Sequence, residues 1–108
     1  MSTTAITVLG LAEGVCKATA SLIDVFNSGR QLRRREMNEL KIRIDYFLRS
    51  EYARQSGELV RVHIEEIAKT QRYIDEQNLT GTALNLAMSQ LEALNSKLSN
   101  SLHNFSCH

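Results

Sequence analysis

The apolar residues of this chain recur at intervals of three and four, the spacing that predicts amphipathic helices. No segment of useful length alternates with a period of two, so we expect no strands. The chain contains no proline, which removes the commonest reason for a helix to stop. The remaining turn signals are Asn27-Ser28-Gly29, where glycine can end a helix, and Asn78-Leu79-Thr80-Gly81-Thr82, where Thr80 or Thr82 can cap one. These signals predict helical segments near 3–27, 30–77 and 82–104.

The long middle segment, 30–77, can form either one helix or two. Unbroken, it would extend for about 70 Å, much further than a compact domain of this size allows. The apolar residues also change face within it, because one row ends at Phe47 and a new row begins at Val60. We therefore predict a break near Ser56-Gly57, giving helices at 30–55 and 58–77. The alternative is one long helix that tolerates a single glycine.

These elements predict an all-α fold. We expect an antiparallel helical bundle of three to four helices, four if the chain breaks near Ser56-Gly57, and oligomerisation is one way to complete it. At this length the chain, 1–108, should form a single helical domain with a modest core. Without the break, a long rod with two shorter helices folded back on it would be typical of a dimer.

Charge is distributed very unevenly along the chain. Twenty of the twenty-five charged residues lie between Ser28 and Gln77, so the first and last helices are almost uncharged. A helix with so few charges has more than one side turned away from water, which indicates apolar surface shared with a partner. The formal net charge of +1 gives no overall attraction to nucleic acid or to an anionic membrane.

The last helix carries the most regular apolar pattern, a row with alternating spacings of four and three and one polar member. This row predicts a self-association interface formed by Leu84, Met88, Leu91, Asn95, Leu98, Leu102 and Phe105. A buried asparagine in such a row can fix the register or the number of partners. The plainer alternative is that the row is the core face of a helix within one bundle.

The first helix has a broad apolar side and the small-residue spacing Gly10-x-x-x-Gly14, which predicts close approach of another helix. Packing inside the protein is the ordinary interpretation. The alternative is a peripheral membrane protein attached through this helix and the arginines that follow it.

That arginine cluster, Arg30, Arg33, Arg34 and Arg35, is the best candidate for a partner-binding surface. Arginine suits carboxylates and phosphates, and we expect a protein partner with an acidic patch. Glu36 and Glu39 lie within one turn and can neutralise part of the cluster. Nucleic-acid binding is a poorer alternative, because it would require more unopposed basic residues.

Motifs for catalysis are missing, and we expect neither an enzyme nor a cofactor. His63 and Glu66 are one turn apart but lack the further ligands of a metal site, and His103, Cys107 and His108 form only a weak set. With two cysteines and no recognisable secretory signal, we expect a cytoplasmic location. The sequence thus predicts a non-enzymatic, self-associating interaction protein, such as an adaptor, inhibitor or assembly subunit.

Overall fold

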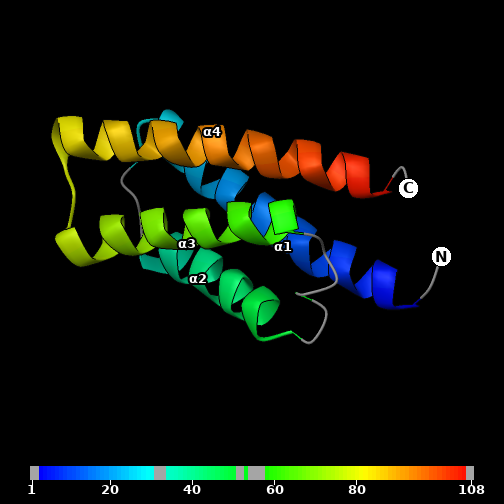
Figure 1. Cartoon of the computed structure of the whole chain (residues 1–108). Coiled ribbons are helices and arrows are strands. Elements are labelled where there is room, and N and C mark those ends of the chain that lie inside the picture. Colours follow the sequence, from blue (N-terminus) through cyan, green and yellow to red (C-terminus); the bar gives the residue numbers. More distant parts are fainter. Residues whose placement is uncertain (1–2, 31–33, 51–52, 54–57, 107–108) are drawn as a thin grey trace.

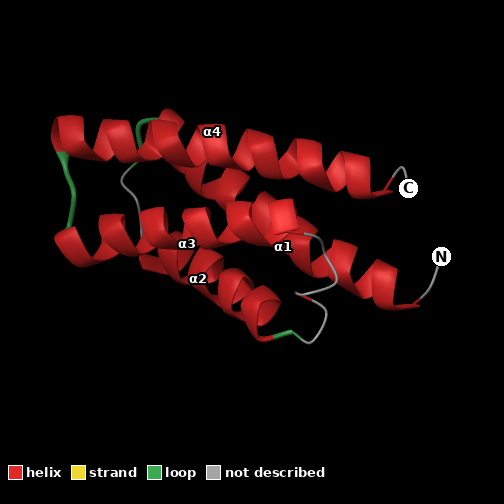
Figure 2. Ribbon diagram, viewed as in Figure 1, coloured by secondary structure: helices red, strands yellow, loops and turns green. Residues whose placement is uncertain are grey.

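The computed structural model describes residues 3–30, 34–50, 53 and 58–106, with side chains for 10–30, 34–50, 53 and 58–104. These residues form the helices α1 (Thr3–Asn27), α2 (Arg34–Arg49), α3 (Glu58–Gln77) and α4 (Gly81–Ser106). No strand is present in the described parts of the chain (Figure 2). The predicted all-α fold is therefore confirmed.

The helices form an antiparallel bundle in which each helix runs opposite to the one before it (Figure 1). Each helix packs against its neighbour in sequence, and α1 also packs along α4, which closes the bundle. The molecule is elongated along the helices, with extents of 44 × 22 × 20 Å. Both ends of the chain consequently lie at the same end of the bundle.

The predicted division of segment 30–77 into two helices is confirmed, but α2 is shorter than expected. It spans Arg34–Arg49 instead of 30–55, and the expected break point near Ser56-Gly57 lies outside the described residues. The helix ends in a bend at Ser50, whose N–H donates to the Phe47 carbonyl. Ala53 is buried beyond that bend, so the connection to α3 contributes a side chain to the core.

The core lies along the axis of the bundle and receives side chains from every helix. Its largest fully buried members are Leu22, Leu40, Phe47, Ile64, Ile67, Leu91 and Leu98. The apolar rows predicted from the sequence form the buried sides of α2 and α3. The row from Met37 to Phe47 is buried on α2, and the row from Val60 to Ile74 is buried on α3. Thr19 is also buried, and its hydroxyl donates to the Val15 carbonyl at 2.8 Å, so it leaves no unpaired donor.

Two connections use the left-handed backbone conformation that the turn signals predicted. Gly29 has φ of 78° and follows the end of α1, with its N–H donating to the Phe26 carbonyl. Asn78 has φ of 48° at the end of α3, a conformation that asparagine tolerates better than most residues. Thr80 precedes α4, and its carbonyl accepts the N–H of Leu84.

The expected close helix approach at Gly10-x-x-x-Gly14 is not present among the described residues. None of these residues lies within 4 Å of a Cβ built on Gly10. A Cβ on Gly14 would meet only the Arg43 side chain, whose Cδ is 3.6 Å away, an ordinary van der Waals distance. The spacing was a poor signal here because the two glycines lie at the edge of the packed side, where neither touches another helix backbone.

Candidate binding surface

The apolar row of α4 forms part of the core of the bundle. Met88, Leu91, Leu98 and Leu102 are buried within the same chain, and Leu84 is partly buried against them. The Phe105 side chain lies outside the described residues. The row therefore lies on the inner face of a bundle helix, as the alternative to a self-association interface predicted. Self-association stays a prediction, and a second copy would have to use another surface or open the bundle.

Asn95, the polar member of this row, links α4 to α1. Its side-chain N–H donates to the backbone carbonyl of Cys16 at 3.2 Å. Its Oδ1 is buried without a hydrogen-bond partner. A polar residue in a heptad row favours the register in which it finds a hydrogen-bond partner. Here that partner is on another helix of the same chain.

The arginine cluster does not form one helix face. Arg30 lies in the connection after α1, where its Nε donates to the Ser28 hydroxyl at 2.9 Å. Arg34 and Arg35 are exposed in the first turn of α2, and Arg33 lies outside the described residues. The predicted start of this helix at residue 30 is wrong, because α2 begins at Arg34, and Arg30 is therefore not on the same helix as Arg34 and Arg35. Glu39 pairs with Arg43 at 3.0 Å, so it is engaged away from the cluster.

A surface that the sequence analysis missed runs along the outer side of α3 and onto α4. Leu59 and Leu86 are each 66% exposed and Tyr73 is 52% exposed, unusually high values for large apolar side chains. Between them on α3 lie Val62 and an ion pair in which Lys69 Nζ is 3.3 Å from Glu66 Oε1. We call this surface the α3–α4 face, formed by Leu59, Val62, Glu66, Lys69, Tyr73 and Leu86.

The α3–α4 face is hollowed at one end. An open groove of about 470 Å³ lies between the two helices, lined by Lys69, Tyr73, Leu79, Ala83, Leu86 and Gln90. Leu79 comes from the short connection between the helices and packs against the core from the side. The signal that could have found this surface is the spacing 59, 62, 66, 69, 73, a second helical row on α3. Charged residues interrupt that row, so a search for apolar rows passes over it.

A smaller exposed apolar pair lies on α2, where Ile42 and Tyr46 face outward one turn apart. It differs from the α3–α4 face because neither Ile42 nor Tyr46 lines the groove beside Tyr73 and Leu86. The pair therefore provides a matched control for substituting Tyr73 and Leu86, since it also consists of an exposed tyrosine and an exposed aliphatic residue.

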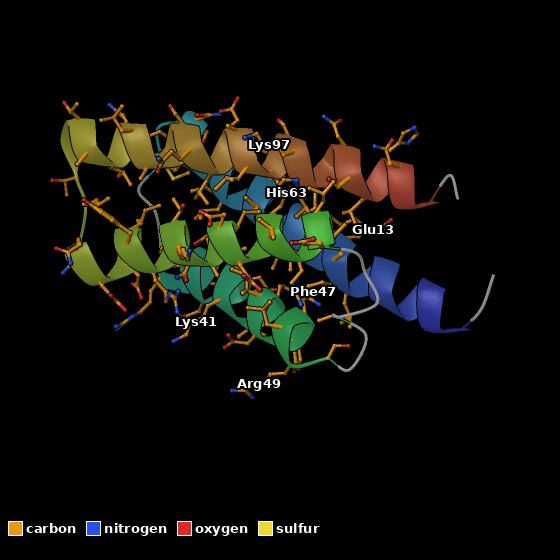
Figure 3. The ribbon with its side chains drawn as sticks, in the orientation of Figure 1. Glu13, Lys41, Phe47, Arg49, His63 and Lys97 are labelled. Carbon is orange, nitrogen blue, oxygen red and sulfur yellow. The ribbon has the colours of Figure 1, made fainter. Side chains whose placement is uncertain are left out.

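Two partly buried side chains, His63 and Cys16, have shifted pKa values. Burial and the nearby Lys97 ammonium both lower the pKa of His63, and Figure 3 shows the two residues on the adjacent helices α3 and α4. Burial raises the pKa of the Cys16 thiol, the Glu13 carboxylate raises it further, and a hydrogen bond from Asn95 partly opposes them. A thiol with a raised pKa is a poor nucleophile at neutral pH, so Cys16 has no sign of catalytic activation.

No cluster of three or more metal-ligating side chains occurs within the described residues. Among the same residues, no helix is long and apolar enough to cross a membrane. The apolar side of α1 is also occupied, because Ala12, Val15, Leu22 and Ile23 pack into the core. Over this part of α1, the outer side carries Glu13, Lys17 and Asp24.

Comparison with known proteins gives no relationship on which to base a function. No protein-family model matches the chain, and no curated protein or solved structure is significantly similar to it.

Proposed function

We propose that this protein is a non-enzymatic interaction protein that acts by binding another protein chain through the α3–α4 face. The observation that carries the proposal is the groove between Tyr73 and Leu86, flanked by two apolar side chains that are more than half exposed. Large apolar side chains beside a groove are typical of protein-binding surfaces, because burying them in a partner removes their contact with water.

The chemistry of the face favours a protein partner over a small polar ligand. Its charged residues are an internally paired Glu66 and Lys69, so it presents little net charge to attract phosphate or nucleic acid. Burying the exposed part of the Leu86 side chain would contribute at most about 1.5–3 kcal/mol to binding. Tyrosine in particular combines a large apolar ring with a hydroxyl that can donate at the rim of an interface.

The test is affinity capture from extracts of the source cells, quantified by mass spectrometry, with two matched double variants. One variant carries Tyr73→Ser and Leu86→Ser on the α3–α4 face. The control carries Tyr46→Ser and Ile42→Ser on α2, which are similarly exposed. We expect proteins that the wild type and the control both capture to be lost with the first variant. Equal capture by both variants would exclude the α3–α4 face as the binding surface.

A further inference from the structure

The outer row of α3 has a charge pattern that is complementary to itself. Along this row lie Leu59, Val62, Glu66, Lys69, Tyr73 and Glu76, with alternating spacings of three and four. The helix runs from Glu58 to Gln77, so its midpoint falls between Ile67 and Ala68. Glu66 and Lys69 lie on either side of the midpoint, Val62 and Tyr73 lie beyond them at equal distances, and Leu59 and Glu76 are the outermost members.

We infer that the partner on this face is a second copy of the chain, with the two α3 helices packed antiparallel about a two-fold axis through that midpoint. Antiparallel packing in this register places Glu66 opposite Lys69 of the other copy, and Lys69 opposite its Glu66. It also places Val62 opposite the other copy's Tyr73 on both sides of the centre, while Leu59 and Glu76 face each other at the two margins of the contact. A two-fold interface requires this reciprocity, in which each residue meets its complement on an identical surface.

The flanking positions of the row agree with the same register. Glu65 and Arg72 lie on the side of the row away from α4, and antiparallel packing brings each beside the other in the second copy. Glu65 already pairs with Arg61 of its own helix at 3.6 Å, and its side chain is 49% exposed, so it can contact Arg72 of the second copy as well. A parallel arrangement would instead place Glu66 against Glu66 and Lys69 against Lys69, which like-charge repulsion disfavours.

The groove explains how the apolar ends of the contact are completed. Tyr73 lines it together with Leu86 and Ala83 of α4. The N-terminal end of the second copy's α3, with Leu59 and Val62, would lie across this groove. The exposed Leu86 of the first copy could then cover that end from the side. The exposed charge pairs select the orientation and contribute little affinity, about 0–1 kcal/mol each, so the apolar ends must supply most of it.

This inference rests on the proposed function, because it names the partner of the same face. A contact centred on one helix of about 30 Å belongs to the smaller class of interfaces, so we expect a reversible dimer whose mass rises with concentration. The experiment is absolute mass by light scattering on the purified full chain, under reducing conditions and over a concentration series. We expect the mass to approach twice the 12.2 kDa of the monomer.

Charge-reversal variants test the register. Lys69→Glu should leave the protein monomeric at concentrations where the wild type is dimeric, because two acidic residues would then face two more. The double variant Glu66→Lys with Lys69→Glu should restore the dimer, since every opposed pair again has opposite charges. Circular dichroism confirms that each variant keeps its helicity. The α2 control, Tyr46→Ser with Ile42→Ser, should dimerise like the wild type.

Cysteine pairing tests the orientation, in chains carrying Cys16→Ala and Cys107→Ala. Oxidation of a mixture of Val62→Cys and Tyr73→Cys chains should give a mixed disulfide, with little pairing of Val62→Cys chains among themselves. Preferential pairing within the Val62→Cys chains would overturn the antiparallel register.

Two mass results would overturn the inference itself: a monomer at every concentration, or a dimer that Lys69→Glu leaves intact. Neither would decide the proposed function, because the capture experiment with the Tyr73 and Leu86 variant measures binding to other proteins independently.

Discussion

The two sides of α3 have the same spacing but different chemistry. On the inner side, Ile64 and Ile67 are fully buried and the row is interrupted only by the buried polar residue Gln71. On the outer side, Val62 and Tyr73 flank the Glu66–Lys69 ion pair and remain in contact with solvent. Spacing alone thus tells which residues share a face. The charge content of each row decides which face enters the core, because an ionised side chain is costly to bury without a partner.

The largest difference in stability should appear when side-chain volume is deleted on the inner side of α3 and, for comparison, on its outer side. Ile67→Ala should lower the free energy of unfolding by about 2–5 kcal/mol, because it removes buried methyl groups and leaves a cavity. Val62→Ala should change it by less than about 0.5 kcal/mol in dilute protein, where the outer side faces water. Urea unfolding followed by circular dichroism measures both. Similar losses for the two variants would show that the outer row is not a free surface.

The next largest change in stability should come from substituting Asn95, the polar member of the inner row of α4. Asn95→Ala should lower the free energy of unfolding by about 1 kcal/mol, because the hydrogen bond to the Cys16 carbonyl is lost. Asn95→Leu should cost less than the alanine variant, since it keeps the volume and removes the buried, unpartnered Oδ1. Thermal unfolding of the two variants checks this order. A greater loss with leucine would mean that the site does not accommodate the branched leucine side chain.

Gly10 tests an exposed position of α1. Gly10→Ala should raise the free energy of unfolding by about 0.5–1 kcal/mol, because alanine is the better helix former and its Cβ would meet none of the described residues. A glycine at a close helix contact would behave in the opposite way and lose stability on substitution. Chemical denaturation decides between them, and a destabilised Gly10→Ala protein would restore the close-approach interpretation of Gly10-x-x-x-Gly14.

The smallest effect concerns His63, which lies at the border between the two sides of α3. Its pKa is lowered in the folded protein, by burial and by Lys97, so protonation favours the unfolded chain. The stability contributed by neutral His63 is complete above the ordinary pKa of about 6.5 and is lost as the pH falls through the lowered value.

The measurement is the difference in melting temperature between about pH 7.5 and about pH 5, on either side of the ordinary histidine pKa. His63→Gln should reduce this difference relative to the wild type, and Lys97→Gln should reduce it less, because burial is the larger cause. An unchanged difference in His63→Gln would assign the pH dependence to other groups.

Much of the fold could be predicted from the sequence because local signals and packing agree. The bounds of α1 and α3 coincide with the predicted segments, and the change of face between Phe47 and Val60 correctly indicated two helices. The end of α2 at Arg49 was not predictable in the same way. The residues that follow it have ordinary helix propensity, and burial of Ala53, a tertiary contact, accompanies the bend at Ser50.

The candidate surface was harder to predict than the fold. The α4 row is regular, and the same heptad pattern serves a core within one chain or an interface between chains, so its pattern could not decide between them. The Tyr73–Leu86 groove joins residues from two helices across a turn, and only their packing brings them together. The arginine cluster stands out in the sequence as a run of charge, but α2 begins within it.

The order of the helices around the bundle has a consequence for how the chain folds. Because each helix packs on its sequence neighbour, most contacts join nearby segments, a topology associated with folding in microseconds to milliseconds. The contact of α1 with α4 is the main exception, and the Asn95–Cys16 hydrogen bond within it joins residues 79 positions apart. Closing so long a loop is entropically costly, so this contact should form after the rate-limiting step. Asn95→Ala should therefore accelerate unfolding while leaving the folding rate nearly unchanged.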